Sequence, residues 1–229
     1  MKKVGCALLS FGVAVLSFAA EKVVSPDGTV AAVFELREGE PVFSLSYKGA
    51  EVLAPAPAGL KLKDAFQGGF EVAEAVRSGA DTAWRPVWGE RAAIPEKYAG
   101  LAVTLRERAP SGRRLVIELR AYNEGLALRW RLPLAEGEAW QVEREQAEFR
   151  FPQGSAAFAI KGTEDTFPQE PIPLGELPGG VMGPLTVRLP DGRYASVLEA
   201  HVEGYPRCRF GRRDGGAVGI NLMGKAEGR

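Results

Sequence analysis

Apolar and polar residues alternate with a period of two over residues 185–198, on both sides of Asp191-Gly192. Successive side chains of a β-strand point to opposite faces, so this alternation is typical of strands. Asp-Gly between two such runs indicates a hairpin, because glycine tolerates the positive φ of a tight turn. The pattern therefore predicts two antiparallel strands, with Glu199 in the loop after the second. The alternating positions are Leu185, Val187, Leu189, Tyr194, Ser196 and Leu198.

Similar alternation recurs along most of the chain, with turn signals between the runs. Ser25-Pro26-Asp27-Gly28 is one such turn, because proline presets its second position and glycine ends it. Helical periodicity is confined to a weak window at residues 69–78, which equally fits a strand with a polar face. The sequence predicts an all-β fold, a large antiparallel β-sandwich. The expected strands cover residues 21–24, 29–36, 42–47, 50–53, 101–108, 114–121, 126–132 and 143–151.

Two segments depart from the strand pattern. Residues 163–180 contain four prolines, which exclude a central strand, so we expect a long surface loop there. Residues 209–229 carry six glycines and little apolar periodicity. We expect these residues to form a poorly ordered tail that follows a domain covering residues 21–208.

The first 20 residues have the pattern of a cleavable secretory signal. Lys2 and Lys3 supply the positive start, an apolar run follows, and Ser17-Phe18-Ala19 precedes the expected cleavage point. Cys6 lies before the apolar run, so it does not fit the lipid-modified cysteine of a lipoprotein. We expect an exported, periplasmic protein that is free of the membrane after cleavage.

Charge and cysteine content exclude several classes of protein. The chain has equal numbers of basic and acidic residues, and loss of Lys2 and Lys3 with the signal leaves a small negative excess. Such a balance offers no field for nucleic acid or anionic lipid. Cleavage also removes Cys6 and leaves Cys208 alone, so no internal disulfide can form.

Five groups of segments, taken in order, match a known pattern. The residues are VVSPDGTV at 23–30 with FSLSYKGAEVLAP at 43–55, WRPVWGE at 84–90, IELRAYNEGLALRWRLP at 117–133, VEREQAEFRFP at 142–152 and EAHVEGYP at 199–206. Each segment alone is a weak signal, whereas five in one order are hard to obtain by chance. On these residues the chain resembles the N-terminal domain of glycoside hydrolase family 97, which contains α-glucosidases and α-galactosidases.

The resemblance implies a galactose mutarotase-like super-sandwich that assists catalysis. In that family the catalytic acid and base lie on a (β/α)₈ barrel, which residues 1–229 do not reach. The resemblance thus implies an accessory, carbohydrate-binding domain that helps to form an α-glycosidase active site. We expect no catalytic residue in this chain and no hydrolysis by it alone. A separately encoded barrel is the partner that this interpretation requires.

The resemblance also implies a calcium ion, held mostly by the barrel, with one carboxylate from the N-terminal domain. Glu199 is the residue that matches this ligand. Calcium takes 6–8 oxygen ligands, so one carboxylate cannot hold it. We therefore expect this chain to bind no cofactor alone, and to contribute Glu199 to a calcium site only when a barrel completes it.

Three residues are candidate contacts to an α-glucoside or α-galactoside. Trp88 can stack on the apolar face of a sugar, and Glu90 lies in the same Pro-flanked, loop-like segment. Glu164 lies in the proline-rich segment, where the family carries an aromatic element. His201 is the only histidine, so the two-histidine chemistry of sugar mutarotases cannot be assembled.

Two other interpretations stay open on the sequence. One is a free-standing, exported carbohydrate-binding module that uses Trp88 and Glu164. The other is a gene fragment without a function of its own, because the glycine-rich sequence after Pro206 departs from the family. Substrate, linkage and stereochemical outcome are set in the barrel, so the sequence of this domain does not specify them.

Overall fold

The computed structural model describes residues 20–160, 170–200 and 202–228. These residues form strands almost throughout, with two single-turn 3₁₀ helices, η1 (Leu174–Glu176) and η2 (Asp214–Gly216). The predicted all-β fold is confirmed. No helix in the described ranges is long and apolar enough to cross a membrane. The predicted signal peptide falls almost wholly outside these ranges.

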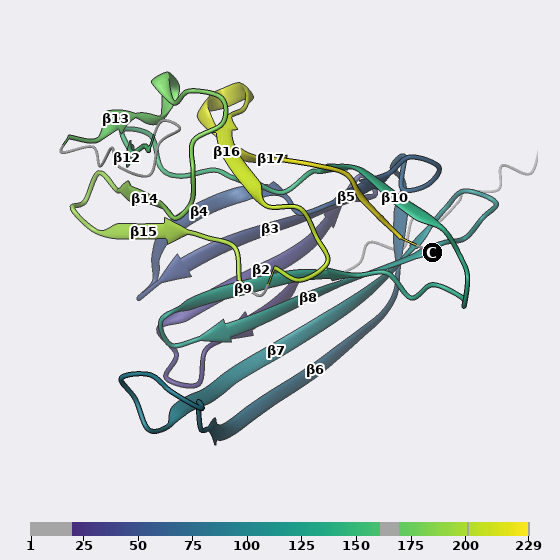
Figure 1. The fold of residues 1–229 in the computed structure, drawn as a ribbon, viewed down its shortest axis with the longest axis horizontal. Helices are drawn as coiled ribbons and strands as arrows, with labels where there is room; N and C mark the ends of the chain where they lie inside the picture. Colours follow the sequence, from purple (N-terminus) through teal and green to yellow (C-terminus); the bar gives the residue numbers. More distant parts are fainter. Residues whose placement is uncertain (1–19, 161–169, 201, 229) are drawn as a thin grey trace, which may run out of the picture.

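Two four-stranded antiparallel sheets form the body of the molecule (Figure 1). The first has the order β1-β2-β3-β4 and the second the order β6-β7-β8-β9, and β1 and β2 pack against β7 and β8. This is the predicted sandwich. The strands are β1 (Glu21–Val24), β2 (Val30–Arg37), β3 (Glu40–Tyr47), β4 (Ala50–Pro57), β6 (Phe70–Trp84), β7 (Ile94–Glu107), β8 (Arg114–Tyr122) and β9 (Gly125–Arg131).

Three smaller antiparallel sheets cover one side of this body (Figure 1). Their orders are β18-β10-β5, β11-β17-β16 and β13-β12-β14-β15. An isolated bridge between Ala54 and Arg150 joins the middle of β4 to the residue after β11. The strands are β5 (Leu60–Leu62), β10 (Trp140–Glu145), β11 (Glu148–Phe149), β12 (Ala156–Phe158), β13 (Ile172–Pro173), β14 (Leu185–Arg188), β15 (Tyr194–Val197), β16 (Cys208–Arg212), β17 (Val218–Leu222) and β18 (Ala226–Gly228).

One hydrophobic core runs through all of these sheets. Each large apolar side chain that is fully buried contributes roughly 1.5–3 kcal/mol relative to exposure. Alternation supplies these side chains: β8 turns Leu115, Ile117 and Leu119 inward and its polar residues outward. The largest fully buried side chains include Phe34, Phe66, Phe70 and Phe210.

The Ser25-Pro26-Asp27-Gly28 turn is confirmed and has a clear structural purpose. The Asp27 carboxylate accepts hydrogen bonds from Ser25 Oγ at 2.7 Å and from the Thr29 backbone N–H at 2.9 Å. These bonds lower the pKa of Asp27, the backbone bond from Thr29 most. The Asp27 N–H also donates to Asn123 Oδ1 at 3.2 Å, which ties this turn to the β8–β9 turn. Two of the segments that carry the family resemblance therefore meet in space and are joined by a hydrogen bond.

The hairpin at Asp191-Gly192 is confirmed, with φ +84° at Gly192 and Arg188 opposite Tyr194. The side chains of its second strand differ from the simplest alternation. Val187 pairs with Ala195, so Ala195 shares the buried face, whereas Tyr194 is 61% exposed. The turn therefore places Tyr194, Ser196 and Leu198 on the solvent side.

The prediction of a poorly ordered tail over residues 209–229 is wrong for the described residues. β16 pairs with β17, and β18 pairs with β10, so this segment belongs to two of the sheets. Phe210, Val218 and Ala226 are buried in the core at about 1% exposure or less. Glycine is used here for close packing: a Cβ at Gly211 would lie 3.3 Å from the Gly179 Cα.

The described part of the proline-rich segment and the ambiguous window at residues 69–78 also have regular structure. Residues 170–180 form the short edge strand β13 and η1, with Leu174 and Leu177 buried, so this half of the expected surface loop contributes to the core. β13 lies at the edge of its sheet, which is where a strand tolerates proline. The ambiguous window at residues 69–78 is the first part of β6.

Candidate functional site

Glu199 lies just beyond the end of β15, on the exposed side of the molecule. Its Oε1 accepts a hydrogen bond of 2.9 Å from the backbone N–H of Cys208, the first residue of β16. This bond ties the Glu199 carboxylate to the start of β16. The structure therefore puts the predicted calcium ligand on the surface with one oxygen already partnered.

A second hydrogen bond anchors Tyr205, which lies between Glu199 and Cys208 in the sequence. The Tyr205 hydroxyl donates to Oε1 of Glu145 at 2.6 Å, and Glu145 is only 7% exposed. Glu145 ends β10 and Tyr205 is half-buried against the core. We call Glu145, Glu199, Tyr205 and Cys208 the Glu145 cluster.

Burial governs the electrostatics of the Glu145 cluster. Loss of solvent raises the pKa of Glu145, and the negative charge of Glu199 raises it further, against the opposing effect of the Tyr205 hydrogen bond. Burial, followed by the charge of Glu199, raises the pKa of the Cys208 thiol to about 12. Burial and the neighbouring Glu145 raise the pKa of the Tyr205 hydroxyl as well. The cluster therefore favours neutral side chains around one surface carboxylate, Glu199.

A shallow hollow of about 310 Å³ opens beside the end of β10, next to this cluster. Side chains of both charge signs line it. The ionisable lining residues are Glu40, Arg144, Glu145, Glu148 and Arg213.

The cluster does not form a metal centre by itself. In the described ranges no group of three histidine, cysteine, aspartate or glutamate side chains is placed to hold a metal ion. Glu199 supplies one carboxylate and Cys208 is a buried thiol. Because calcium needs several oxygen ligands, Glu199 fits a calcium site only together with ligands from outside the described residues.

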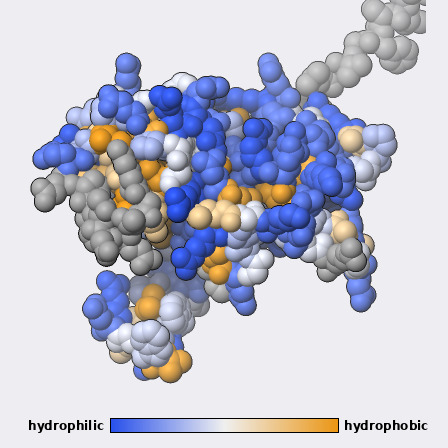
Figure 2. Space-filling model, turned by 45° about the horizontal axis from the view of Figure 1, so that its top comes forward, coloured by the Kyte–Doolittle hydropathy of each residue, from blue (hydrophilic) through white to orange (hydrophobic). Residues whose placement is uncertain are grey.

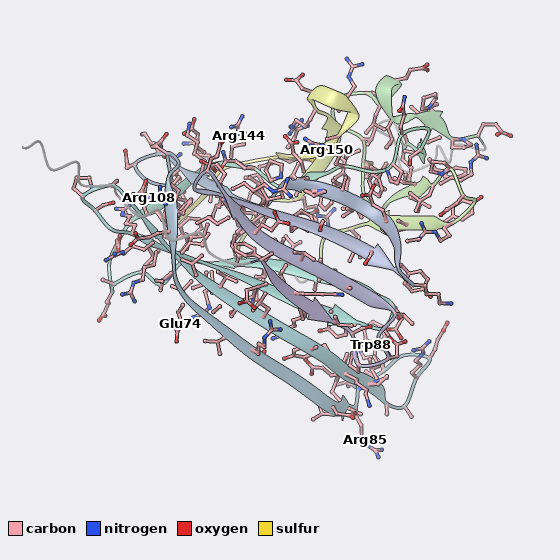
Figure 3. The ribbon with its side chains drawn as sticks, turned by 180° about the vertical axis from the view of Figure 1, so that it is seen from behind. Glu74, Arg85, Trp88, Arg108, Arg144 and Arg150 are labelled. Atoms are coloured by element: carbon pink, nitrogen blue, oxygen red, sulfur yellow. The ribbon has the colours of Figure 1, made fainter. Side chains whose placement is uncertain are left out.

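Trp88 and Glu90 lie in another part of the molecule, in the loop that joins β6 and β7. Trp88 is 88% exposed and the preceding Val87 is 98% exposed. Figure 3 shows Trp88 and Arg85 at the far end of this hairpin, remote from Arg144 and Arg150. The indole is therefore free to stack on a ligand, against the general tendency of tryptophan in a sandwich to be buried. Glu164 and His201 lie outside the described residues.

The sequence analysis missed Glu145 as a buried acid, and the reason is a β-bulge. Strict alternation along β10 places Glu143 and Glu145 on the face opposite Val142. The register with β5 shifts between Val142 and Arg144, which turns Glu145 rather than Arg144 toward the core. No sequence signal marks this bulge, whereas the tyrosine of the EAHVEGYP segment was visible within the motif.

The sequence model of the Glycosyl-hydrolase 97 N-terminal family matches residues 23–225 of this chain. The match extends past Cys208 and includes β16 and β17, which lie in the segment that the sequence analysis expected to be a poorly ordered tail. It covers the Asp27 turn, the β6–β7 hairpin and the Glu145 cluster.

Solved structures show the same fold. A glycoside hydrolase family 97 enzyme from Pseudoalteromonas sp. strain K8, in complex with acarbose, has 23% sequence identity and a TM-score of 0.80, over 88% of this chain and 32% of that chain. A variant of that enzyme in complex with panose gives the same values. A beta-arabinopyranosidase has 22% identity and a TM-score of 0.76, over 88% of this chain and 35% of that one. The chain thus spans about a third of the length of the solved structures that it matches.

Proposed function

The chain belongs to the Glycosyl-hydrolase 97 N-terminal family, and on that premise we propose that it is the accessory sandwich domain of an α-glycosidase. In this proposal the domain binds carbohydrate and completes an active site whose acid and base come from a catalytic barrel outside these residues. The substrates are α-glucosides or α-galactosides. The chain is exported to the periplasm by its cleaved signal.

The observation that carries this proposal is the way the fold holds Glu199. Glu199 is anchored by the Cys208 N–H, and Tyr205, six residues further along the chain, is anchored by its hydrogen bond to Glu145. Glu199 therefore offers a carboxylate at the surface on a braced loop, which suits a ligand shared with a neighbouring domain. Calcium would be held by Glu199 and several barrel oxygens, and it would supply charge stabilisation beside the glycosidic bond.

Reconstitution tests the proposal. The mature chain is mixed with a separately produced family 97 barrel that lacks its own N-terminal domain, and hydrolysis of p-nitrophenyl α-glucoside and α-galactoside is followed with and without calcium. We expect no turnover by the chain alone and calcium-dependent turnover by the mixture. Glu199→Gln should abolish the gain, whereas the surface control Glu143→Gln should retain it. Turnover by the chain alone that is lost in Glu199→Gln would contradict the proposal.

A second candidate function is a free-standing carbohydrate-binding module, favoured by the exposure of Trp88 at the hairpin tip. Stacking of an indole on a sugar ring needs such an open face. Titration with maltooligosaccharides and galactosides distinguishes the two functions. The module predicts binding that is lost in Trp88→Ala and retained in Trp84→Ala, a half-exposed tryptophan on the same hairpin. Binding that survives Trp88→Ala excludes the hairpin tip as the sugar site.

A further inference from the structure

The long strand β6 forms one edge of its sheet, and nothing in the described ranges pairs with its outer side. Its partner β7 pairs with it continuously from Glu74 to Trp84. Over that stretch every β6 residue except Ala80 is exposed. A long, regular edge presents a row of free N–H and C=O groups that can pair with another strand.

Two of the usual protections of an edge strand, a proline and a bulge, are absent from this stretch. It contains no proline, and the one irregularity in its register lies earlier, between Val72 and Glu74. Its centre is Ser78-Gly79-Ala80, where small side chains leave the backbone accessible. Natural sheets normally block an open edge with prolines, bulges or repelling charges.

We propose that β6 pairs antiparallel with β6 of a second copy of this chain, about a two-fold axis at Gly79. The pairing joins two four-stranded sheets into one continuous eight-stranded sheet across the dimer. In a symmetric antiparallel pair, each residue before the axis faces the residue equally far after it in the other copy. This inference goes beyond the proposed glycosidase role and does not depend on it.

Charge complementarity selects this register. Arg77 and Asp81 lie equally far from Gly79, so Arg77 of one copy faces Asp81 of the second copy, and symmetry repeats the pair. Directly opposed side chains have Cβ atoms about 4.5–5.5 Å apart, close enough for an ion pair. The two side chains are 59% and 73% exposed, although Arg77 also reaches Glu21 and Asp81 also reaches Lys97.

The apolar residues of the strand agree with the same register. Val76 and Trp84 are its large exposed hydrophobic side chains, at 47% and 51%. Both lie on the face opposite Arg77 and Asp81, because their numbers differ in parity. With the axis at Gly79, Val76 faces Thr82 of the second copy and lies diagonal to its Trp84, within reach of an aromatic ring. Figure 2 shows apolar side chains on the projecting lower-left end of the molecule.

Other registers satisfy the strand less well. An axis at Arg77 or at Asp81 places that charge opposite its own copy, which is repulsive. An axis at Ser78 or Ala80 removes the charges from direct opposition. Gly79 is therefore the axis that combines opposed charges of unlike sign with cover for Val76 and Trp84.

Light scattering after size exclusion tests the dimer on the mature chain. We expect a concentration-dependent dimer that Arg77→Asp or Asp81→Arg alone converts to monomer, because each change places like charges opposite each other. The double variant Arg77→Asp/Asp81→Arg should restore the dimer. Arg129→Asp is the matched control, since it also breaks an ion pair but lies on β9 at the other edge of this sheet. A monomeric wild type, or a dimer that neither single change weakens, would overturn the proposal.

Cysteine crosslinking tests the register itself. Two directly opposed residues of an antiparallel pair have Cα atoms about 4.5–5.5 Å apart, within the span of a disulfide. Gly79→Cys should therefore form a dimer that reductant dissolves, whereas Ala75→Cys should not, because the two copies of residue 75 lie roughly 26 Å apart along the strands. A Cβ at Gly79 meets the Tyr98 carbonyl oxygen at 3.1 Å. Arg77→Cys/Asp81→Cys is the second variant, and failure of both to crosslink rejects the Gly79 axis.

Discussion

The Tyr205 hydroxyl lies 2.6 Å from Oε1 of Glu145 and donates a hydrogen bond to it across 60 residues of sequence. This one bond connects the end of β10 to the loop that carries Glu199. Glu145 is buried and its pKa is raised, so the folded chain favours its neutral form. The loop that carries the surface carboxylate is thus connected to a buried acid on a distant strand.

Replacement of Glu145 should make stability depend less on pH. A carboxyl whose pKa is raised by folding binds its proton more tightly in the folded chain, so its contribution is complete below the unfolded value of about 4.3 and is lost as pH rises through the folded value. We expect Glu145→Gln to match the wild type near pH 4 and to melt at a higher temperature at pH 7. Thermal unfolding from pH 4 to pH 8 measures this, with the exposed neighbour Glu143→Gln as control. Parallel curves for Glu145→Gln and the wild type would contradict it.

Loss of the Tyr205 hydroxyl should destabilise the chain. Tyr205→Phe leaves the buried carboxyl of Glu145 without its donor, which costs about 1–3 kcal/mol in unfolding free energy. Urea unfolding measures the loss. The double variant Tyr205→Phe/Glu145→Ala should lose less than the sum of its two single changes, because each single change already removes the same hydrogen bond. Strict additivity would mean that the hydrogen bond contributes nothing to stability.

The Cys208 thiol should be unreactive in the folded chain. It is 8% exposed, and burial together with Glu199 raises its pKa to about 12, so almost no thiolate is present at neutral pH. We expect a maleimide or a disulfide reagent to label the mature chain only on unfolding. Glu199→Gln removes the neighbouring negative charge that raises the thiol pKa, and should speed labelling several-fold. Rapid labelling of the wild type would show that this loop opens in solution.

How far the sequence predicts this molecule depends on the range of the interactions involved. Local signals sufficed for the turn at Asp27 and for the hairpin at Gly192, because both are fixed by residues next to one another in the chain. Glu145 could not be predicted as buried, since its orientation follows from a bulge against β5 that no local pattern marks. The exposure of Trp88 depends on how far the β6–β7 hairpin projects beyond its neighbours, which is a property of the whole sheet.

The structure of the segment after Cys208 could not be predicted from local signals either. Its six glycines interrupt the alternating pattern of a strand pair whose apolar residues are few but buried. Phe210 is 1% exposed, its ring centroid lies 6.3 Å from that of Phe149, and its backbone bonds in both directions with Val181 at 2.8 Å. We expect Phe210→Ala to cost about 3–5 kcal/mol, as for other buried phenylalanines. Met223→Ala is the control, because that side chain is 56% exposed.

Limited proteolysis provides a second measurement of the same prediction. The wild type should resist cleavage between residues 208 and 222, and Phe210→Ala should be cut there quickly. Rapid loss of this segment from the wild type, with the sandwich left intact, would show that β16 and β17 do not belong to the cooperative fold.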